Sequence, residues 1–339
     1  MNSHIQQIRQ QAEISSFSGV ISIFQDGTEL FNEAFGEADI ANGRSNQTTT
    51  KFGIASGTKV FTALGIGVLV TQGKLSLDTQ IHSIFQQDLS WIHPEATIAH
   101  LLNHTSGIFD YYDEELITDF DNFFVSIPWH ALETPTDYLP LFKNEKAKFK
   151  PGERFSYSNG GYICLGIIIE KVSGLLYREF IQQHVFAPAG MSDSGYYAFD
   201  ALPEDTANGY KAEENGRFLT NIYNLPIRGA SDGGAYTTTG DMLTFWQALL
   251  DNKILPQELT TIFTTPQVEA YENINYGYGF YLSQINGKKM IYLVGEDAGV
   301  SFRSRVIPEK EIVVTVLSNQ SEGVYEMLDP ITDYLKETV

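Results

Sequence analysis

The chain has 339 residues, a length typical of two domains or of one large domain with an insertion. Hydrophobic residues make up 42% of it, which is enough for an ordinary buried core and excludes wholesale disorder. Lys and Arg total 22 against 42 Asp and Glu, so the formal net charge is −20. Because that charge repels phosphate backbones and anionic lipids, we expect neither nucleic-acid nor membrane partners. The single cysteine, Cys164, excludes an internal disulfide and a multi-cysteine metal site.

The first residues are polar and contain no apolar core of a secretion signal. The longest apolar run, residues 63–70, is about a third of the length that a bilayer span needs. We therefore expect a soluble and cytoplasmic protein, although a chain whose leader had been removed would look the same.

The predicted elements of the N-terminal part begin with an amphipathic helix after Ser3, in which Ile5, Ile8 and Ala12 recur at helical spacing. A β-hairpin follows, with strands at residues 20–24 and 30–35 around an Asp26-Gly27 turn, and a second turn is expected at Asn42-Gly43. Residues 57–72 predict a buried helix that ends at Gly73.

Residues 75–225 contain helical patches, loops and aromatic clusters, including an apolar helix at 163–172. The C-terminal part predicts a helix at 240–251, strands at 276–283, 288–295, 302–307 and 312–318, and a closing helix at 323–337. Strands at both ends predict one shared sheet. We therefore expect an α+β chain with a discontinuous sheet domain, residues 1–74 plus 226–339, and an inserted, mainly helical domain, residues 75–225.

The segment from Phe52 to Lys59 carries the first candidate for chemistry, Ser56-x-x-Lys59. If a helix begins near Ser56, residues three apart share a face, so the Lys59 amine lies beside the Ser56 hydroxyl. A desolvated lysine can remove the proton of a serine nucleophile, and the helix N-terminus can stabilise an oxyanion. The alternative is a serine near a helix start with a surface lysine one turn later.

A second candidate is Tyr157-x-Asn159, which precedes the apolar helix at 163–172. In an extended segment these two side chains point the same way, so both could face Ser56 and Lys59. A lysine ammonium nearby would favour ionised tyrosine, which could then act as a general base or proton relay. The alternative is a structural turn that caps the helix.

The pairing of Ser56-x-x-Lys59 with Tyr157-x-Asn159 resembles the serine β-lactamase and penicillin-binding protein superfamily. It is most similar to the class C β-lactamase-like branch, which also holds esterases and D-amino-acid peptidases. Segments in the same order extend the resemblance across nearly the whole chain; they are residues 69–78, 98–107, 186–191, 233–241, 276–279 and 314–319. The implied fold is an antiparallel sheet flanked by helices with an inserted helical domain, and the active-site cleft lies between the two.

The resemblance also implies roles. Ser56 would form an acyl-enzyme, while Lys59 and Tyr157 would share the proton transfers; the residues alone leave open which of them is the base. Asn159 would orient the substrate, and the backbone N–H groups of Ser56 and Gly299 would form the oxyanion hole. No metal and no organic cofactor is implied.

The third motif of the family, Lys-Ser/Thr-Gly or Gly-His-x-Gly-Gly, is altered here. The matching stretch has Glu296 at the Lys or His position, followed by Asp297 and Ala298, with Ala298 at a usual glycine. Glu296 would repel a substrate carboxylate by about 1 kcal/mol or more, which disfavours penicillins and peptides ending in D-alanine. We expect Glu296, Asp297 and Ala298 at the substrate. Alternatively, Glu296 is paired with Lys288, Lys289 or Arg303, or is protonated by burial.

A second acidic feature runs from Asp110 to Glu115 and from Asp119 to Phe124, where carboxylates alternate with aromatic rings. In the family this loop overhangs the cleft, so Tyr111 and Tyr112 are further candidates for binding a substrate cation. The alternative is a solvated acidic face over a small aromatic core.

Two other patterns do not fit their motifs. Gly229 to Gly233 matches the Gly-x-Ser-x-Gly elbow of α/β-hydrolases, but no histidine follows His184 to complete a triad. His100 and His104 are spaced like a metal pair, but Leu101 stands where a metalloprotease needs Glu.

We therefore expect a serine hydrolase, an esterase or amide/peptide hydrolase, that acts on small neutral or amine-bearing molecules. The alternatives are a β-lactamase or D-alanine carboxypeptidase, and a binding or sensor module that acylates slowly. The sequence predicts no oligomeric state.

Overall fold

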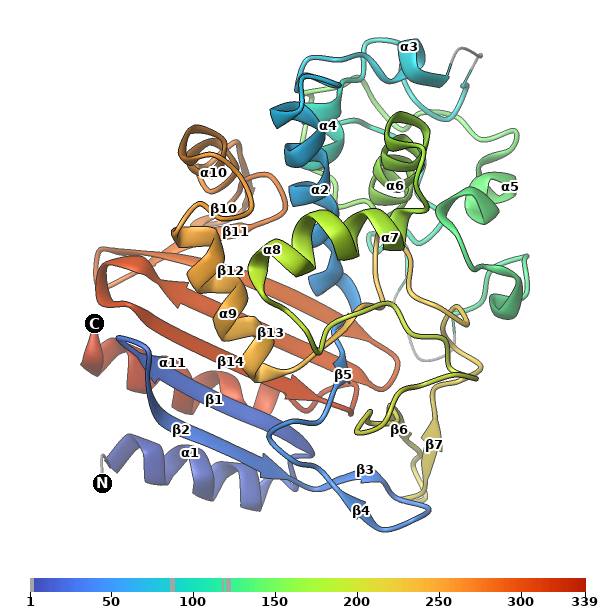
Figure 1. Ribbon diagram of the computed structural model, residues 1–339. Coiled ribbons are helices and arrows are strands. Elements are labelled where there is room, and N and C mark those ends of the chain that lie inside the picture. Colours follow the sequence, from blue (N-terminus) through green and yellow to red (C-terminus); the bar gives the residue numbers. More distant parts are fainter. Residues whose placement is uncertain (1–2, 86–88, 118, 120–122) are drawn as a thin grey trace.

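A single antiparallel sheet of eight strands forms the centre of the computed structural model, which describes residues 3–85, 89–117, 119 and 123–339 (Figure 1). The strand order is β2-β1-β14-β13-β12-β11-β10-β9. These strands are β1 (Gly19–Gln25), β2 (Thr28–Phe35), β9 (Val268–Tyr271), β10 (Ile274–Tyr276), β11 (Tyr281–Ile285), β12 (Lys288–Asp297), β13 (Val300–Ile307) and β14 (Ile312–Ser318). Short pairs lie outside the sheet: β3 (Glu37–Asp39) with β4 (Arg44–Ser45), β5 (Phe52–Gly53) with β8 (Tyr236–Thr237), and β6 (Tyr210–Ala212) with β7 (Phe218–Thr220).

The helices fall into two groups. Those that pack on the sheet or beside it are α1 (Ser3–Ile14), η1 (Ala55–Thr58), α2 (Lys59–Thr71), α9 (Thr239–Leu250), α10 (Gln257–Phe263), η6 (Pro308–Lys310) and α11 (Tyr325–Thr338). Those between α2 and α9 in the chain are α3 (Ile81–Phe85), α4 (Ile98–Leu102), η3 (Trp129–Ala131), η4 (Pro135–Tyr138), α5 (Leu139–Phe142), α6 (Asn159–Ser173), α7 (Tyr177–Ile181), η5 (Gln182–Phe186) and α8 (Ala187–Ala189).

The two ends of the chain share the sheet, as the sequence predicts. Strand β1 pairs with β14 in a register that sets Gly19 opposite Ser318. Helices α1 and α11 lie together on one face of the sheet, where Ile8 and Met327 are fully buried (Figure 1). A larger hydrophobic cluster covers the opposite face and extends through α2, α6 and α9. The predicted fold class, an antiparallel sheet with a helical part inserted in the chain, is confirmed.

Most of the predicted local elements are confirmed, because their signals are local. The Asp26-Gly27 turn has φ of 50° and 71°, the left-handed backbone that a tight hairpin requires. Helix α1 buries Ile5, Ile8 and Ala12 at the expected spacing.

The strand predicted at 276–283 is wrong, because the chain reverses within it. Residues 277–280 form the turn between the antiparallel strands β10 and β11, in which Tyr276 pairs with Tyr281. Gly279, at φ +87°, turns the chain, and a Cβ there would lie 2.6 Å from the Cβ of Ala63 on α2. The glycines therefore allow this turn to approach α2 closely.

Helix α2 is apolar on all sides and lies in the core, where it contacts α6. Among the described residues no single helix is long and apolar enough to cross a bilayer. Helix α6 and the stretch Tyr177–Ala189 reach that length only together, and a bend of 79° separates them. The boundaries predicted for the inserted domain, residues 75 and 225, stay a prediction.

Candidate active site

Ser56 lies in the short helix η1, and a strained backbone sets its position. Ala55, immediately before it, has φ of +43°, a conformation that costs a non-glycine residue free energy and is common at functional sites. The surrounding pairing maintains it, since Gly53 pairs with Tyr236 and the Gly234 N–H donates to the Ala55 carbonyl at 3.2 Å. Ser56 is thereby held at the N-terminal end of the continuous helical stretch η1–α2.

Strand β12 packs directly against η1. A Cβ at Gly295 would lie 2.0 Å from the Ile54 carbonyl oxygen and 2.8 Å from the Gly57 nitrogen. A Cβ at Gly57 would lie 2.5 Å from the ring of Phe302 on the neighbouring strand β13. Glycine is therefore required at both positions. The contact fixes the distance between the nucleophile and the end of β12.

The amine of Lys59 has three acceptors. Its Nζ atom lies 3.0 Å from Ser56 Oγ, 2.7 Å from Asn159 Oδ1 and 2.6 Å from the carbonyl oxygen of Asp232. Lys59 is 2% exposed. Ser56, Lys59 and Asn159 are thus brought together as the sequence predicts.

Burial lowers the pKa of Lys59 from its usual value, because the charged form loses its hydration. The carboxyl groups of Asp232, Glu114, Asp110 and Asp297 act in the opposite direction but do not cancel the effect. The neutral form of Lys59 is therefore easier to reach by deprotonation than that of an exposed lysine, and a neutral amine can accept the Ser56 proton.

Asn159 begins helix α6, which Ser158 caps by accepting from the Gly161 N–H. The buried carboxyl group of Asp110 accepts from the backbone N–H groups of Asn159 at 2.9 Å and Gly160 at 2.8 Å. Burial raises the pKa of Asp110 to about 7 despite these bonds. Asp110, from the acidic loop, thus anchors the helix start that presents Asn159 to Lys59.

Tyr157 also lies at Lys59, whose Nζ atom is 4.8 Å from the centre of the tyrosine ring. Burial is the main cause that raises the pKa of Tyr157 well above its usual value; Glu114 adds to it, and a hydrogen bond with Ser56 works against it. The net direction of the Tyr157 pKa is therefore opposite to the ionised form that the sequence suggests, because burial dominates. Tyr157 is present as a neutral phenol that can pass a proton on.

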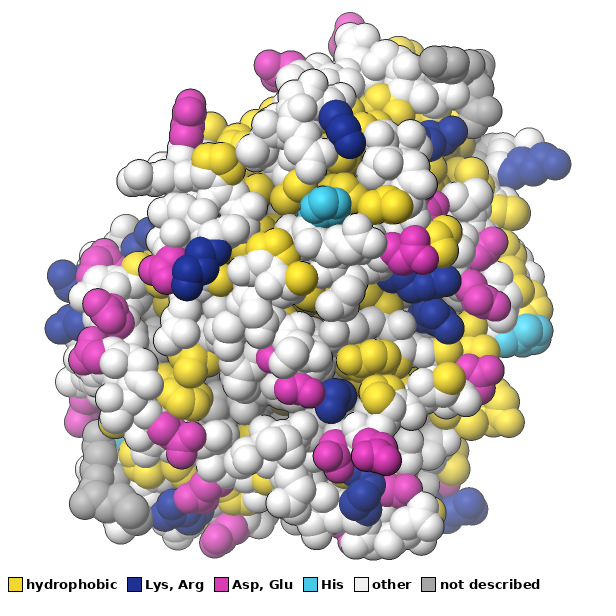
Figure 2. Space-filling view, viewed as in Figure 1, with side chains coloured by type: hydrophobic (Ala, Val, Ile, Leu, Met, Phe, Trp, Pro, Cys, Tyr) yellow, Lys and Arg dark blue, Asp and Glu magenta, His cyan; other side chains and the backbone are white. Residues whose placement is uncertain are grey.

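A pocket with an empty volume of about 970 Å³, open solvent included, opens beside Ser56. Its wall includes aromatic rings, amide side chains and four carboxyl groups, which belong to Glu114, Asp232, Glu296 and Asp297. Of the described residues that line it, none is Lys, Arg or His. Figure 2 shows acidic side chains spread over one face of the molecule with basic ones between them. On that face the negative charge is not gathered in one patch.

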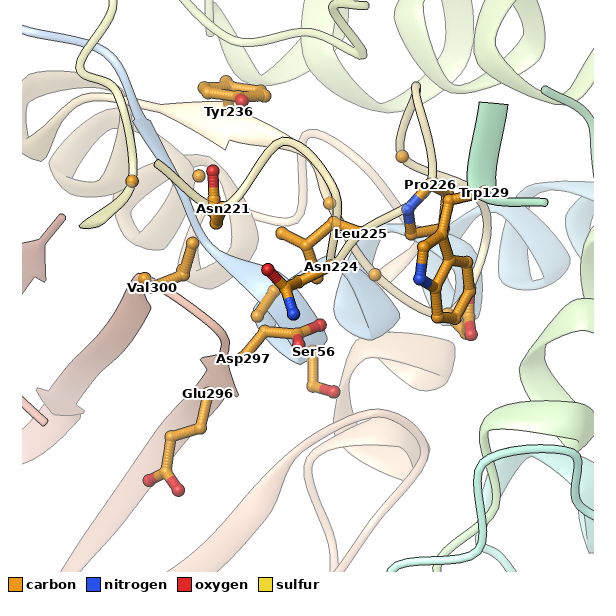
Figure 3. A pocket seen from close by; sticks show the side chains of 18 of the residues that line it. Ser56, Trp129, Asn221, Asn224, Leu225, Pro226, Tyr236, Glu296, Asp297 and Val300 are labelled. Carbon is orange, nitrogen blue, oxygen red and sulfur yellow. The ribbon is translucent and has the colours of Figure 1, made fainter. Parts of the chain in front are cut away.

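Glu296, at the altered third motif, is turned away from Ser56 (Figure 3). Its carboxylate accepts hydrogen bonds from the Arg303 guanidinium and, at 2.5 Å, from the Tyr325 hydroxyl. Of the alternatives weighed for Glu296, the pairing with Arg303 is the one found. The Asp297 carboxyl group lies on the Ser56 side instead (Figure 3).

Asp297 is followed by two residues with different surroundings. Ala298 is fully buried, and its carbonyl accepts from Asn221 at 2.8 Å, so it is not among the residues that line the pocket. Gly299 lines the pocket, but its N–H donates to Ser321 Oγ at 2.8 Å. The oxyanion role of Gly299 stays a prediction, and it requires this amide to exchange Ser321 for the substrate.

The acidic loop meets the pocket at Tyr111 and Tyr112, both of which line it. Tyr111 donates to an Asp232 carboxylate oxygen at 2.5 Å. Phe120, Asp121 and Asn122, which belong to the predicted feature, lie outside the described residues. Glu115 pairs with Arg154 at the surface.

Sequence reasoning missed Asp232, whose carbonyl binds Lys59 and whose carboxyl group lines the pocket. The available signal was a carboxyl residue directly before Gly233, where the family-like segment 233–241 begins. It also missed Trp129 in the pocket wall, whose Nε1 atom has no hydrogen-bond partner among the described residues.

The Gly-x-Ser-x-Gly stretch and the His100/His104 pair, which do not fit their motifs, make hydrogen bonds that stabilise the fold. Ser231 is fully buried under α2, where Thr62 donates to its carbonyl. His104 accepts from the Ser158 N–H through Nδ1 at 3.0 Å, and His100 Nδ1 lies 3.0 Å from the Thr97 hydroxyl. In the described part of the chain, no three His, Cys, Asp or Glu residues lie close enough to hold a metal ion.

The site has a serine that is hydrogen-bonded to a buried lysine, with a tyrosine and an asparagine beside them at a helix start. This arrangement of residues is suited to acyl transfer through the serine. The family model described as "Beta-lactamase" matches residues 1–335. The chain therefore belongs to the beta-lactamase family, in its class C-like branch, and is a serine hydrolase of that family.

Relatives cover nearly the whole chain. Penicillin-binding protein 4* of Bacillus subtilis is 30% identical in an alignment of 336 positions that covers 93% of this chain and 71% of the relative. The structure of a penicillin binding protein from Bacillus halodurans is 40% identical, with a TM-score of 0.91, over 96% of this chain and 99% of the other. A D-amino acid amidase from Ochrobactrum anthropi shares the fold, with a TM-score of 0.82 and 23% identity, over 99% of each chain.

Proposed function

We propose that this protein hydrolyses ester or amide bonds of small molecules through a covalent acyl-enzyme on Ser56. The observation that carries the proposal is the buried amine of Lys59, hydrogen-bonded to Ser56, Asn159 and the Asp232 carbonyl. When Lys59 is neutral, two of these bonds can hold the amine in place while its lone pair accepts the Ser56 proton.

In the first step Ser56 Oγ attacks the substrate carbonyl carbon, and Lys59 takes the hydroxyl proton. The neutral hydroxyl of Tyr157 then relays a proton to the leaving alcohol or amine as its bond to the carbonyl carbon breaks. Water attacks the acyl-enzyme in the second step, and the same groups return the proton to Ser56 as the acid is released.

The pocket supports small substrates without a carboxylate, since Glu114, Asp232 and Asp297 line it, while Glu296 is paired with Arg303 and no described cationic side chain lines the pocket. This favours neutral or amine-bearing esters and amides over penicillins. The name of the Ochrobactrum relative, a D-amino acid amidase, agrees with an amide substrate.

The test combines a fluorophosphonate label with a p-nitrophenyl butyrate assay. We expect the label on Ser56 by peptide mass spectrometry, and ester turnover that Ser56→Ala abolishes. Turnover that survives Ser56→Ala, or a label on another residue, would contradict the proposal.

A second candidate is a penicillin-recognising module that acylates slowly. The penicillin binding protein from Bacillus halodurans, 40% identical to this chain, favours it. Stoichiometric labelling of Ser56 by a fluorescent penicillin without turnover of any ester or amide would support this candidate over hydrolysis.

A further inference from the structure

We propose that Asp297 is the specificity-determining residue of the Ser56 site and selects substrates that carry a protonated amine. This inference rests on the proposed hydrolysis at Ser56 and adds the chemical class of its substrate. The inference is based on two observations: Glu296 and Asp297 lie on opposite faces of β12, and the carboxyl groups around Ser56 have different hydrogen-bond partners.

Neighbouring residues of a strand point to opposite faces, so the contact of Gly295 with η1 fixes the rest of β12. Gly295 faces the Ile54 carbonyl, and Asp297, two residues later, is on that same face. Glu296 is on the opposite face, where Arg303 and Tyr325 bind its carboxylate. Figure 3 shows the consequence: Asp297 lies beside Ser56, and Glu296 points away from it.

The carboxyl groups that act on Lys59 differ in their partners. Glu114 accepts from the Asn159 side-chain amide at 3.3 Å. Asp110 accepts two backbone N–H groups at the start of α6, and Asp232 accepts from the Tyr111 hydroxyl. Asp297 accepts from the N–H of the adjacent Ala298 and from the Tyr112 hydroxyl, and both donors are uncharged. Asp297 therefore has no cationic side chain hydrogen-bonded to it among the described residues.

Lys59 does not supply that charge by direct contact. Its three N–H groups are directed at Ser56, Asn159 and the Asp232 carbonyl, and none of these is a carboxylate oxygen. One lysine therefore lies among several carboxyl groups that it does not bind directly. A substrate ammonium at Asp297 would add the missing positive charge.

The rest of the pocket suits such a molecule. The rings of Tyr111 and Tyr112, 6.3 Å apart between centroids, belong to the same wall and can hold a cation through their faces. Trp129, Tyr138 and Leu225 provide apolar surface for the uncharged part of the substrate. The fitting class is a small amino-acid ester or amide with a free amine.

The test compares three p-nitroanilides of alanine, in both enantiomers: the free amine, the N-acetyl derivative and the N-succinyl derivative, which bears a carboxylate. The kcat/KM of each is measured for the unmodified protein, for Asp297→Asn and for Glu296→Gln. Asp297→Asn keeps the size of the side chain, and its thermal melting curve and fluorophosphonate labelling show whether it is folded. Glu296→Gln is the matched control, since it neutralises the adjacent carboxyl group on the other face of β12.

We expect the unmodified protein to prefer the free amine over the N-acetyl compound by about tenfold or more in the better enantiomer. Asp297→Asn should reduce this ratio by a similar factor, while Glu296→Gln preserves it. An unchanged ratio in Asp297→Asn, or a loss in Glu296→Gln instead, would overturn the inference. If p-nitrophenyl butyrate is turned over through Ser56 without any amine preference, only this inference fails; if Ser56 is never acylated, the proposed function fails with it.

Discussion

The Nζ atom of Lys59 lies 3.0 Å from the Oγ atom of Ser56, one helical turn earlier in the chain. Two further acceptors, from α6 and from the segment before β8, fix the amine in this place. Three parts of the chain distant in sequence therefore determine the position of one nitrogen atom. Removal of the Lys59 amine should therefore affect the rate of the chemical step far more than substrate binding.

Lys59→Met should lower kcat/KM by about 10³-fold or more, because Ser56 then lacks a base. The measurement is acylation by the fluorophosphonate together with ester turnover. Lys74→Met, at an exposed position, is the control and should leave both unchanged. Acylation at the normal rate in Lys59→Met would show that another group is the base.

Tyr157→Phe should reduce kcat by about 10²-fold or more with a smaller effect on KM, because the ring that packs over Lys59 remains while the relay hydroxyl is lost. Single-turnover kinetics on an ester and an anilide check this, and the loss should be larger for the anilide, whose leaving group needs a proton. Tyr292→Phe, on β12 and stacked on Tyr281, is the control. Equal losses of kcat in Tyr157→Phe and Tyr292→Phe would contradict the role of Tyr157 as a proton relay.

Much of the fold follows from local patterns. The Asp26-Gly27 turn and the amphipathic α1 are specified within a few residues, and each forms as its sequence predicts. The Ser56–Lys59 contact is also local, since it needs only a helical turn. Asn159 lies 100 residues away from Lys59 in the chain, so its contact was predicted through family resemblance and not through spacing.

Other features depend on contacts that no short segment contains. The turn from Gly277 to Phe280, which joins β10 to β11, packs closely against α2, where a Cβ at Gly279 would meet Ala63. The distinction between Glu296 and Asp297 depends on which face of β12 meets η1. A sequence motif places both residues at the site, and only the register of the sheet separates their roles.

Asp297 should make stability depend on pH. Burial, with Asp232 and Glu114 nearby, raises the pKa of Asp297 to about 7, while Lys59 and the Ala298 N–H act against this. Because the unfolded chain ionises this group near pH 4, the native state loses stability as the pH rises from about 4 to 7. Asp297→Asn should therefore be more stable than the unmodified protein at pH 8, by about 1–3 kcal/mol.

Urea unfolding at several pH values measures that difference. The difference in the free energy of unfolding between Asp297→Asn and the unmodified protein should be absent near pH 4, increase up to about pH 7 and then stay constant. Glu296→Gln is again the comparison. A gap that narrows toward pH 8 would mean that folding favours the ionised form of Asp297.

Gly295→Ala should destabilise the protein by about 3 kcal/mol or more and abolish activity, because the new Cβ meets the Ile54 carbonyl oxygen at 2.0 Å. Thermal and urea unfolding measure the loss. Gly240→Ala, at an exposed position in the first turn of α9, meets nothing closer than 3.7 Å and should raise stability by about 0.5 kcal/mol. Similar stability for both variants would show that β12 can move away from η1 at little cost.

The pairing of β1 with β14 joins segments about 300 residues apart in the chain. During synthesis, β1 and the hairpin it forms with β2 leave the ribosome long before any strand exists to complete the sheet. The helix η1, which carries Ser56, must also wait for its partner, because it packs on β12, which is translated about 240 residues later. Loop closure of this length makes sheet assembly a late and slow step. Hydrolytic competence therefore arises only after β12 to β14 have been translated, and a nascent chain that lacks these strands cannot act on substrates.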